Sequence, residues 1–197
     1  METATVTKIR VRIEHDDSPP DPIGDWDGQW KFYQFDSGWR HYAERETVLA
    51  RDEDGNLEDF ELVIRLAAGL AFPVRYSEHG LCRWSQGGDV DDCDGMVIWE
   101  DPIDDLGPES IEDRRKDAEQ FLDIYTDWCN GSVYGYVIEK VTEDEDGDED
   151  EEEEIDAAWG FFGTDIDYML EEIKSAIRRA KCESLEIEYT GDAAWLA

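Results

Sequence analysis

Three histidines and four cysteines are the residues of this chain best suited to acid-base or nucleophilic chemistry. His79 has the most reactive neighbours, because Glu78 precedes it and Cys82 follows it by three positions. A histidine beside a thiol can act as the base that activates the thiol as a nucleophile. On an extended segment, however, successive side chains point to opposite faces. We therefore expect a structural histidine, no catalytic residues and no enzyme activity, with the His79 cluster as the alternative that would make the chain an enzyme.

The cysteines lack the spacing of a metal site or of a disulfide framework. Cys82, Cys93, Cys129 and Cys182 include no C-x-x-C pair, and no two histidines have the spacing of metal ligands. Zinc sites and the disulfide scaffolds of small secreted proteins commonly use such closely spaced cysteines. We expect free buried thiols, with a link between Cys82 and Cys93 as the alternative, and neither a metal nor a cofactor.

Carboxylates dominate the composition, with 53 acidic residues against 18 lysines and arginines and a formal net charge of -35. Residues 142–153 partly fit the calcium loop of an EF-hand, with Asp144, Asp146, Gly147 and Glu153 at the third, fifth, sixth and twelfth positions. The first position, which needs Asp, holds Thr142. Because strands are expected on both sides of this loop, we predict no EF-hand and only diffuse binding of cations.

Two acidic stretches stand out. Eleven of the twelve residues 143–154 are acidic, and residues 84–113 contain eleven acids without one lysine or arginine. Such a surface repels nucleic acid directly and favours a strongly basic protein partner. The predicted partner-binding residues are Asp89, Asp91, Asp92, Asp94, Glu100, Asp101, Asp104, Asp105, Glu109, Glu112, Asp113, Asp144, Asp146, Asp148 and Glu151.

Alternating or short apolar segments predict strands through most of the first half. Residues 7–15 place Ile9, Val11 and Ile13 on one side and basic residues on the other, as in a half-buried strand whose cations pair with neighbouring acids. Further strands are expected at residues 30–35, 44–50, 57–66, 70–76, 81–85 and 96–99. A loop is expected at residues 16–27, which contain three prolines.

The second half changes to a helical period. Ser110 and Asp113 fit a capping box, and the helix that they begin should end at Asn130-Gly131. Strands are expected at residues 133–141, 155–162 and 185–189, with 143–154 as a hairpin loop. Thr164 is expected to cap a second helix. Its apolar stripe is Ile166, Met169, Leu170, Ile173, Ile177 and Ala180.

These elements predict an α+β fold with a mainly antiparallel sheet and two amphipathic helices in the C-terminal half. We expect one domain over residues 1–197, with a subdivision into a β-rich part at 1–66 and an α+β part at 67–197 as the alternative. No apolar span of about twenty residues and no signal-peptide pattern is present in the sequence, so we expect a soluble intracellular protein without membrane contact. The oligomeric state is left open.

Two pairs of motifs carry a resemblance to known proteins. The first pair is residues 72–81, FPVRYSEHGL, leading into 94–99, DGMVIW. The second is residues 130–139, NGSVYGYVIE, followed by 159–163, WGFFG. Over residues 70–180 the chain resembles a group of uncharacterised proteins from phages and plasmids, in which the second pair forms paired strands before a last helix. The loop between those strands is commonly short in this group, whereas here it carries the acidic insertion.

The resemblance implies an origin in a mobile genetic element and, with the acidity, suggests a DNA mimic. Such proteins display carboxylates much as a duplex displays phosphates, and inhibit restriction, CRISPR or other nucleic-acid-binding proteins of the host cell. The alternative is adaptation to molar salt, where hydrated carboxylates keep a surface soluble and the chain is an accessory or binding protein. Twelve arginines against six lysines fit that alternative. The acidity does not depend on one segment, since an excess of 24 acids remains without residues 143–154.

Overall fold

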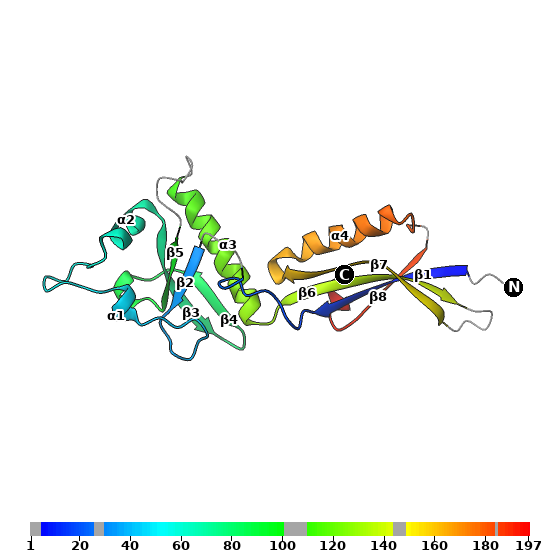
Figure 1. Cartoon of the computed structure of the whole chain (residues 1–197), viewed down its shortest axis with the longest axis horizontal. Coiled ribbons are helices and arrows are strands. Elements are labelled where there is room, and N and C mark those ends of the chain that lie inside the picture. The colour runs from blue at the N-terminus through cyan, green and yellow to red at the C-terminus, as the bar shows by residue number, and fades with distance from the viewer. Residues whose placement is uncertain (1–4, 26–29, 101–109, 144–148, 184) are drawn as a thin grey trace. The chain divides into compact units, whose positions relative to one another are not determined.

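The computed structural model describes residues 5–25, 30–100, 110–143, 149–183 and 185–197 (Figure 1). The chain divides into two compact units. The terminal unit comprises Met1–Pro19 with Gly131–Ala197, and the central unit comprises Pro20–Asn130. The division therefore falls at Pro19 and Asn130 instead of at residue 66. The reason is that the first strand, β1 (Thr5–His15), pairs with β6 (Val133–Glu143) far along the chain.

The terminal unit is a four-stranded sheet with one helix. The strand order is β7-β6-β1-β8, with β7 at Glu149–Phe162 and β8 at Glu186–Thr190. Neighbouring strands are antiparallel except for β1 and β8, which are parallel. Helix α4, Ile166–Arg179, lies along one face of this sheet (Figure 1). Short 3-10 turns stand before α4 and after β8, at Gly163–Asp165 (η3) and Ala194–Leu196 (η4).

The core of the terminal unit follows the predicted periodicities. Ile9, Val11 and Ile13 of β1 are fully buried and pack in one cluster with Met169 and Ile173 of α4. Alternation on the strand and helical spacing on α4 therefore bring the expected apolar faces together.

The start of α4 differs from the expectation in one detail. Its N-cap is Asp165, whose side chain makes no capping hydrogen bond, whereas Thr164 lies one residue earlier in η3. The tighter 3-10 turn takes up Thr164 and delays the first residue of the α-helix.

The central unit is an antiparallel sheet covered on both faces. Its strand order is β2-β5-β3-β4, with strands Trp30–Gln34 (β2), Gly95–Trp99 (β5), Ala71–Glu78 (β3) and Cys82–Gln86 (β4). The long helix α3, Ile111–Cys129, packs on one face, and α1 (Arg45–Val48) and α2 (Phe60–Ala68) lie on the other (Figure 1). A 3-10 turn, η1 (Val90–Asp92), stands between β4 and β5.

The α+β class and the mainly antiparallel sheets are confirmed by these elements. The predicted capping box of α3 is confirmed too, because the Ser110 side chain accepts from the Asp113 N–H and the Asp113 side chain accepts from the Ser110 N–H. The helix continues to Cys129 and is followed by Asn130 and Gly131, as expected.

Two predicted strands are wrong. Residues 44–50 contain the single helical turn α1, and residues 57–66 contain most of α2. The Asp59 side chain accepts from two backbone N–H groups of the first turn, and Gly69 ends α2 in the left-handed conformation. The alternating residues Phe60 and Ile64 are exposed, whereas Leu62 and Arg65 are buried. Burial therefore follows the helical period and not the alternation that predicted a strand.

The acidic run is also not a simple hairpin loop. Residues 149–154 belong to β7 and pair with β6, where Glu152 stands opposite Val141 and Glu153 opposite Lys140. The remaining acids of the run, from 144 to 148, lie outside the described residues. A row of adjacent glutamates is a poor strand former by itself, so its place in the sheet needs a specific electrostatic partner.

The close contact of Gly191 with β1 gives a test of this fold. Gly191 has a φ of 94°, and an added Cβ would lie 2.3 Å from the Ile13 carbonyl oxygen. Gly160 has a φ of 85° but nothing within 4 Å of an added Cβ. We expect Gly191→Ala to destabilise the protein by roughly 3 kcal/mol, because a backbone clash adds to the conformational strain, and Gly160→Ala by only about 1 kcal/mol. Chemical denaturation measures both, and equal losses would contradict the Ile13 contact.

Candidate functional site

Three basic residues of β1 form the centre of an ionic network in the terminal unit. Lys8, Arg10 and Arg12 alternate with the buried residues of β1, so they occupy the sheet face opposite α4. The Lys8 ammonium lies 3.0 Å from Glu149, 3.1 Å from Glu188 and 3.7 Å from Glu143. One cation is thus shared by carboxylates from β6, β7 and β8.

The two arginines extend the network along β1. Arg10 pairs with Glu149 and Glu152 of β7 and lies 3.6 Å from Glu188 of β8. Arg12 lies 3.2 Å from Glu139 and 3.6 Å from Glu14. These contacts confirm the expectation that the basic strand pairs with neighbouring acids. They also supply the partner that the glutamate-rich part of β7 needs.

The network crosses an intervening strand. In the order β7-β6-β1, Glu149 and Glu152 must reach over β6 to meet Lys8 and Arg10 on β1. Val141 of β6 stands between Lys8 of β1 and Glu152 of β7 in the sheet register, and its side chain is fully buried. The long charged side chains therefore cover apolar surface with their methylene groups while their charged ends meet.

The charges of this network are held in their ionised forms. Hydrogen bonds from Lys8 and Arg10 lower the pKa of Glu149. Hydrogen bonds to Glu149 and Glu188 raise the pKa of Lys8. Both shifts favour the ion pairs at neutral pH, because each partner stabilises the charged form of the other.

The rest of the acidic run is only partly neutralised. Glu152, Glu153 and Glu154 are exposed on β7, and Lys140 lies 3.4 Å from Glu153. Glu154 forms no ion pair with the described residues. Of the predicted partner-binding residues in this run, Asp144, Asp146 and Asp148 lie outside the described part of the chain, and Glu151 is placed in β7 by its backbone alone.

The acids of residues 84–113 are closer to basic residues than their sequence suggests. Arg51 pairs with Asp91, and Arg75 lies 2.6 Å from Asp92 and 3.9 Å from Asp94. The hydrogen bond from Arg75 lowers the pKa of Asp92. The segment between β4 and β5 is therefore acidic in sequence, but arginines from elsewhere in the central unit neutralise much of it.

The other predicted residues of this stretch are dispersed. Glu100 lies 3.1 Å from Lys31, and Asp113 is occupied by the α3 capping box, where hydrogen bonds from Ser110 lower its pKa. Asp89 and Glu112 form no ion pair among the described residues. Asp101, Asp104, Asp105 and Glu109 lie outside the described residues. The structure thus brings together Asp89, Asp91, Asp92 and Asp94 around η1 and leaves the described remainder apart.

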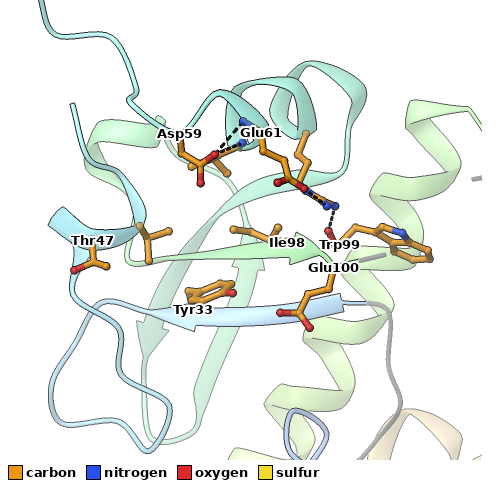
Figure 2. A pocket seen from close by; sticks show the side chains of 10 residues that line it. Tyr33, Thr47, Asp59, Glu61, Ile98, Trp99 and Glu100 are labelled. Atoms are coloured by element: carbon orange, nitrogen blue, oxygen red, sulfur yellow. Dashed lines mark hydrogen bonds and ion pairs between the residues drawn. The ribbon is translucent and has the colours of Figure 1, made fainter. Parts of the chain in front are cut away.

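A pocket of about 530 Å³ lies in the central unit between α2 and the strands β2 and β5 (Figure 2). Tyr33 and Ile98 lie between Thr47 and Glu100, and Asp59 and Glu61 lie on α2 above them (Figure 2). The pocket is lined by Tyr33, Thr47, Val48, Asp59, Glu61, Leu62, Arg65, Ile98, Trp99 and Glu100.

The charged groups of this pocket are already engaged. Buried Arg65 lies 2.6 Å from Glu61 and donates to the Trp99 carbonyl oxygen, and the Asp59 carboxylate caps α2. Burial raises the pKa of Tyr33. These contacts give Arg65, Glu61 and Asp59 structural roles at the edge of the pocket.

The His79 cluster does not form a catalytic pair. His79 is exposed in the turn between β3 and β4, while the Cys82 thiol lies beside the Cys129 side chain. Burial raises the pKa of both thiols, that of Cys129 to about 12. An activated cysteine needs a lowered pKa, so this geometry gives a structural contact instead. All four cysteines are free, so the alternative link between Cys82 and Cys93 is wrong.

One histidine contact was missed from the sequence. His41 Nε2 lies 3.0 Å from Asp21 Oδ2, and the His41 ring lies beside Tyr125 and Trp128. Twenty positions separate His41 from Asp21, so no local motif indicated the pair. Burial raises the pKa of the neighbouring Tyr125, which leaves its hydroxyl protonated and unsuited to act as a nucleophile.

The described residues also bear on metal and membrane binding. They contain no group of three or more His, Cys, Asp or Glu side chains placed to hold a metal ion. No helix in the same part of the chain is long and apolar enough to cross a membrane. The comparisons of the chain with protein-family models, curated proteins and solved structures found no match. The class defined by the structure is thus an acidic α+β protein with a cross-strand ionic network.

The ion pairs of Glu149 predict an acid-sensitive contribution to stability. Its pKa in the folded protein is below the usual 4.5, so the pairs stabilise the fold above that pH and are lost as the pH falls through the folded-state pKa. We expect Glu149→Gln to lower the melting temperature at neutral pH, and this difference to shrink as the pH falls below 4.5. Glu154→Gln on the same strand is the matched control and should leave the melting temperature unchanged. A constant deficit of Glu149→Gln down to about pH 3 would contradict the network.

Proposed function

We propose that this protein is an acidic inhibitor, encoded by a phage or another mobile element, that binds a basic nucleic-acid-binding protein of the host by DNA mimicry. The target would be a restriction or CRISPR protein, and binding would block its access to DNA. The observation that supports this proposal is the row of acidic residues in strand β7, at residues 149–154. A strand holds carboxylates at fixed positions, whereas a flexible loop would lose conformational freedom on binding.

The spacing of this row is compatible with mimicry of every second phosphate. Successive side chains of a strand point to opposite faces, so carboxylates on one face recur at about 6.8 Å, which is twice the axial spacing of about 3.4 Å between phosphates on one strand of duplex DNA. Glu152, Glu153 and Glu154 are exposed along this row. Lys8 pairs with Glu149, and Arg10 pairs with Glu152. Acidic residues still outnumber these cations along the row, so the row stays negative.

The proposal has consequences for partner, chemistry and location. Binding would release counterions from the basic partner, so affinity would fall steeply with salt. The protein itself would neither bind nucleic acid nor catalyse a reaction, because occupying the partner's DNA-binding cleft suffices for inhibition. It would act in the cytoplasm of the host cell, where such partners meet DNA.

Adaptation to high salt is the second candidate function of the acidity. Exposed carboxylates occur in both units, such as Glu53 and Asp54 in the central unit and Glu183 and Asp192 in the terminal unit. This wide distribution favours a general acidic coat, which stays soluble when salt screens most charges. The protein would then be an accessory or binding protein whose acidity does not identify its partner.

A competition experiment tests mimicry. The protein is added to a panel of purified restriction endonucleases and Cas nucleases bound to labelled duplex DNA. We expect it to displace DNA from at least one of them. The triple variant Glu152→Gln, Glu153→Gln, Glu154→Gln should compete about tenfold less well and reduce the salt slope by roughly 3.

The matched control for this experiment is Glu46→Gln, Glu53→Gln, Asp54→Asn, which removes three exposed charges from the central unit. We expect it to compete like the parent protein. Displacement from no member of the panel, or equal weakening by both triple variants, would count against the β7 row as a DNA mimic.

Thermal melting against salt concentration separates the two candidates. Under mimicry, stabilisation by sodium chloride should saturate near physiological ionic strength, because the Debye length is already about 8 Å at 0.15 M. Under salt adaptation, the melting temperature should keep rising to several molar salt. A continued rise together with no competition for DNA would favour the second candidate.

A further inference from the structure

A second pocket of the central unit, of about 380 Å³, has mostly aromatic walls. It is lined by Phe35, Asp36, Ser37, Trp39, Tyr42, Arg45, Tyr76, Trp84 and Asp94. Five of these nine residues are aromatic and two are carboxylates. The volume is within the range of small-molecule sites, which runs from about 300 to 1,000 Å³. The pocket is separate from the ionic network, which belongs to the terminal unit.

Three of the aromatic lining residues pack against one another. The rings of Trp39 and Tyr76 are 5.1 Å apart at 73°, and those of Trp39 and Trp84 are 5.3 Å apart at 70°. Trp84 is buried and forms the inner wall, whereas Tyr42 is 45% exposed at the rim. Aromatic faces carry partial negative charge, so the ring surface that these contacts leave uncovered attracts a cation.

The carboxylates are fixed beside these rings. Asp94 Oδ2 accepts from the Tyr76 backbone N–H at 2.9 Å, and Asp36 Oδ1 accepts from the Gly38 N–H at 2.8 Å. The Asp36 carbonyl also accepts from the Trp39 N–H at 3.1 Å, which fixes the turn that joins these two lining residues. The pocket therefore combines negative charge with aromatic surface.

Arg45 is the one cation among the lining residues, and its own contacts occupy it. Its guanidinium donates to the carbonyl oxygens of Asp91, at 3.0 Å, and Cys93, and it lies 5.3 Å from the centre of the Phe35 ring. Tyr42 and the half-buried Trp39 and Tyr76 keep ring surface for a ligand, whereas Trp84 is buried among its neighbours. Asp36 and Asp94 stand against Arg45 in the lining, and Arg75 lies 3.9 Å from Asp94. Among the described residues Asp36 forms no ion pair, so it leaves negative charge in the lining, which disfavours anions.

We propose that this pocket binds a quaternary ammonium group. Such a group donates no hydrogen bond, so it gains most from aromatic faces and nearby negative charge. A metal ion or primary ammonium needs several oxygen acceptors, and only two of the nine lining residues carry a carboxylate. The group belongs either to a free small molecule of the choline type or to a trimethylated lysine of a protein. This inference stands apart from the proposed DNA mimicry.

Choline and 3,3-dimethylbutan-1-ol form the decisive pair of probes, because the alcohol has the same shape without the charge. Binding to the full chain is followed by the NMR signals of the tryptophan indole N–H groups and by calorimetry. Measurements in about 0.3 M sodium chloride suppress the general attraction of cations to so acidic a protein. We expect saturable binding of choline, at least about tenfold weaker binding of the alcohol, and no shift with the same increment of sodium.

Two variants locate the site. Tyr42→Leu and Trp39→Leu should each weaken choline binding at least about fivefold, because each removes one aromatic face. Tyr168→Leu is the matched control, since Tyr168 is 61% exposed in the terminal unit, and should bind choline like the parent. Tyr42 is exposed enough for its variant to keep the fold, which thermal melting verifies. Equal binding of choline and the alcohol, or unchanged binding by Tyr42→Leu, overturns the proposal.

Peptides distinguish the source of the ammonium group. A short peptide with a central trimethyllysine is compared with the unmethylated peptide and with free choline. Tighter binding of the trimethylated peptide than of choline indicates a protein ligand, and binding of choline alone indicates a small molecule. Binding of neither probe, or equal binding of the two peptides, overturns the inference without bearing on competition for DNA.

Discussion

Strand β1 has one apolar face and one charged face, and the terminal unit depends on this division. Its odd-numbered residues, such as Ile9 and Val11, are fully buried against α4, while Lys8 and Arg10 between them meet glutamates on the other face. A slip of one residue would place cations in the core and isoleucine among carboxylates. Hydrophobic packing and ion pairing therefore specify the same register. Surface ion pairs contribute little stability singly, so their main effect here is on register and strand order.

The same network explains how an acidic segment becomes part of a sheet. Glutamate is a poor strand former, yet β7 begins at Glu149 because Lys8 and Arg10 lie within reach across β6. Both edges of this sheet, β7 and β8, carry exposed glutamates. Charged edges discourage pairing with strands of other molecules, so the acidity protects the sheet in addition to any role in recognition. A basic partner would approach a surface that is negative and already ordered.

Local patterns predicted the elements whose signals do not depend on distant residues. The alternation in β1, the capping box at Ser110 and the helical stripe of α4 were sufficient for the class and for most strands. The apolar pattern at residues 57–66 fits the periods of both a strand and a helix, and the side-chain cap of Asp59 favours the helix. Contacts between distant residues had no local signal. The sequence could not show that Arg75 neutralises Asp92, that His41 meets Asp21, or that aromatic residues from three segments line one pocket.

The position of β1 also sets the order in which the chain can fold during synthesis. The central unit is continuous from Pro20 to Asn130, so all its strands and helices can assemble once that stretch has left the ribosome. The strand β1 is made first, yet its neighbours β6 and β8 are made after residue 130. Until then its apolar face is uncovered and its three cations lack the glutamates of β7 and β8. The nascent chain thus exposes a basic strand with an uncovered apolar face. Helix α4 later covers the apolar face, and the glutamates of β7 and β8 later pair with the cations.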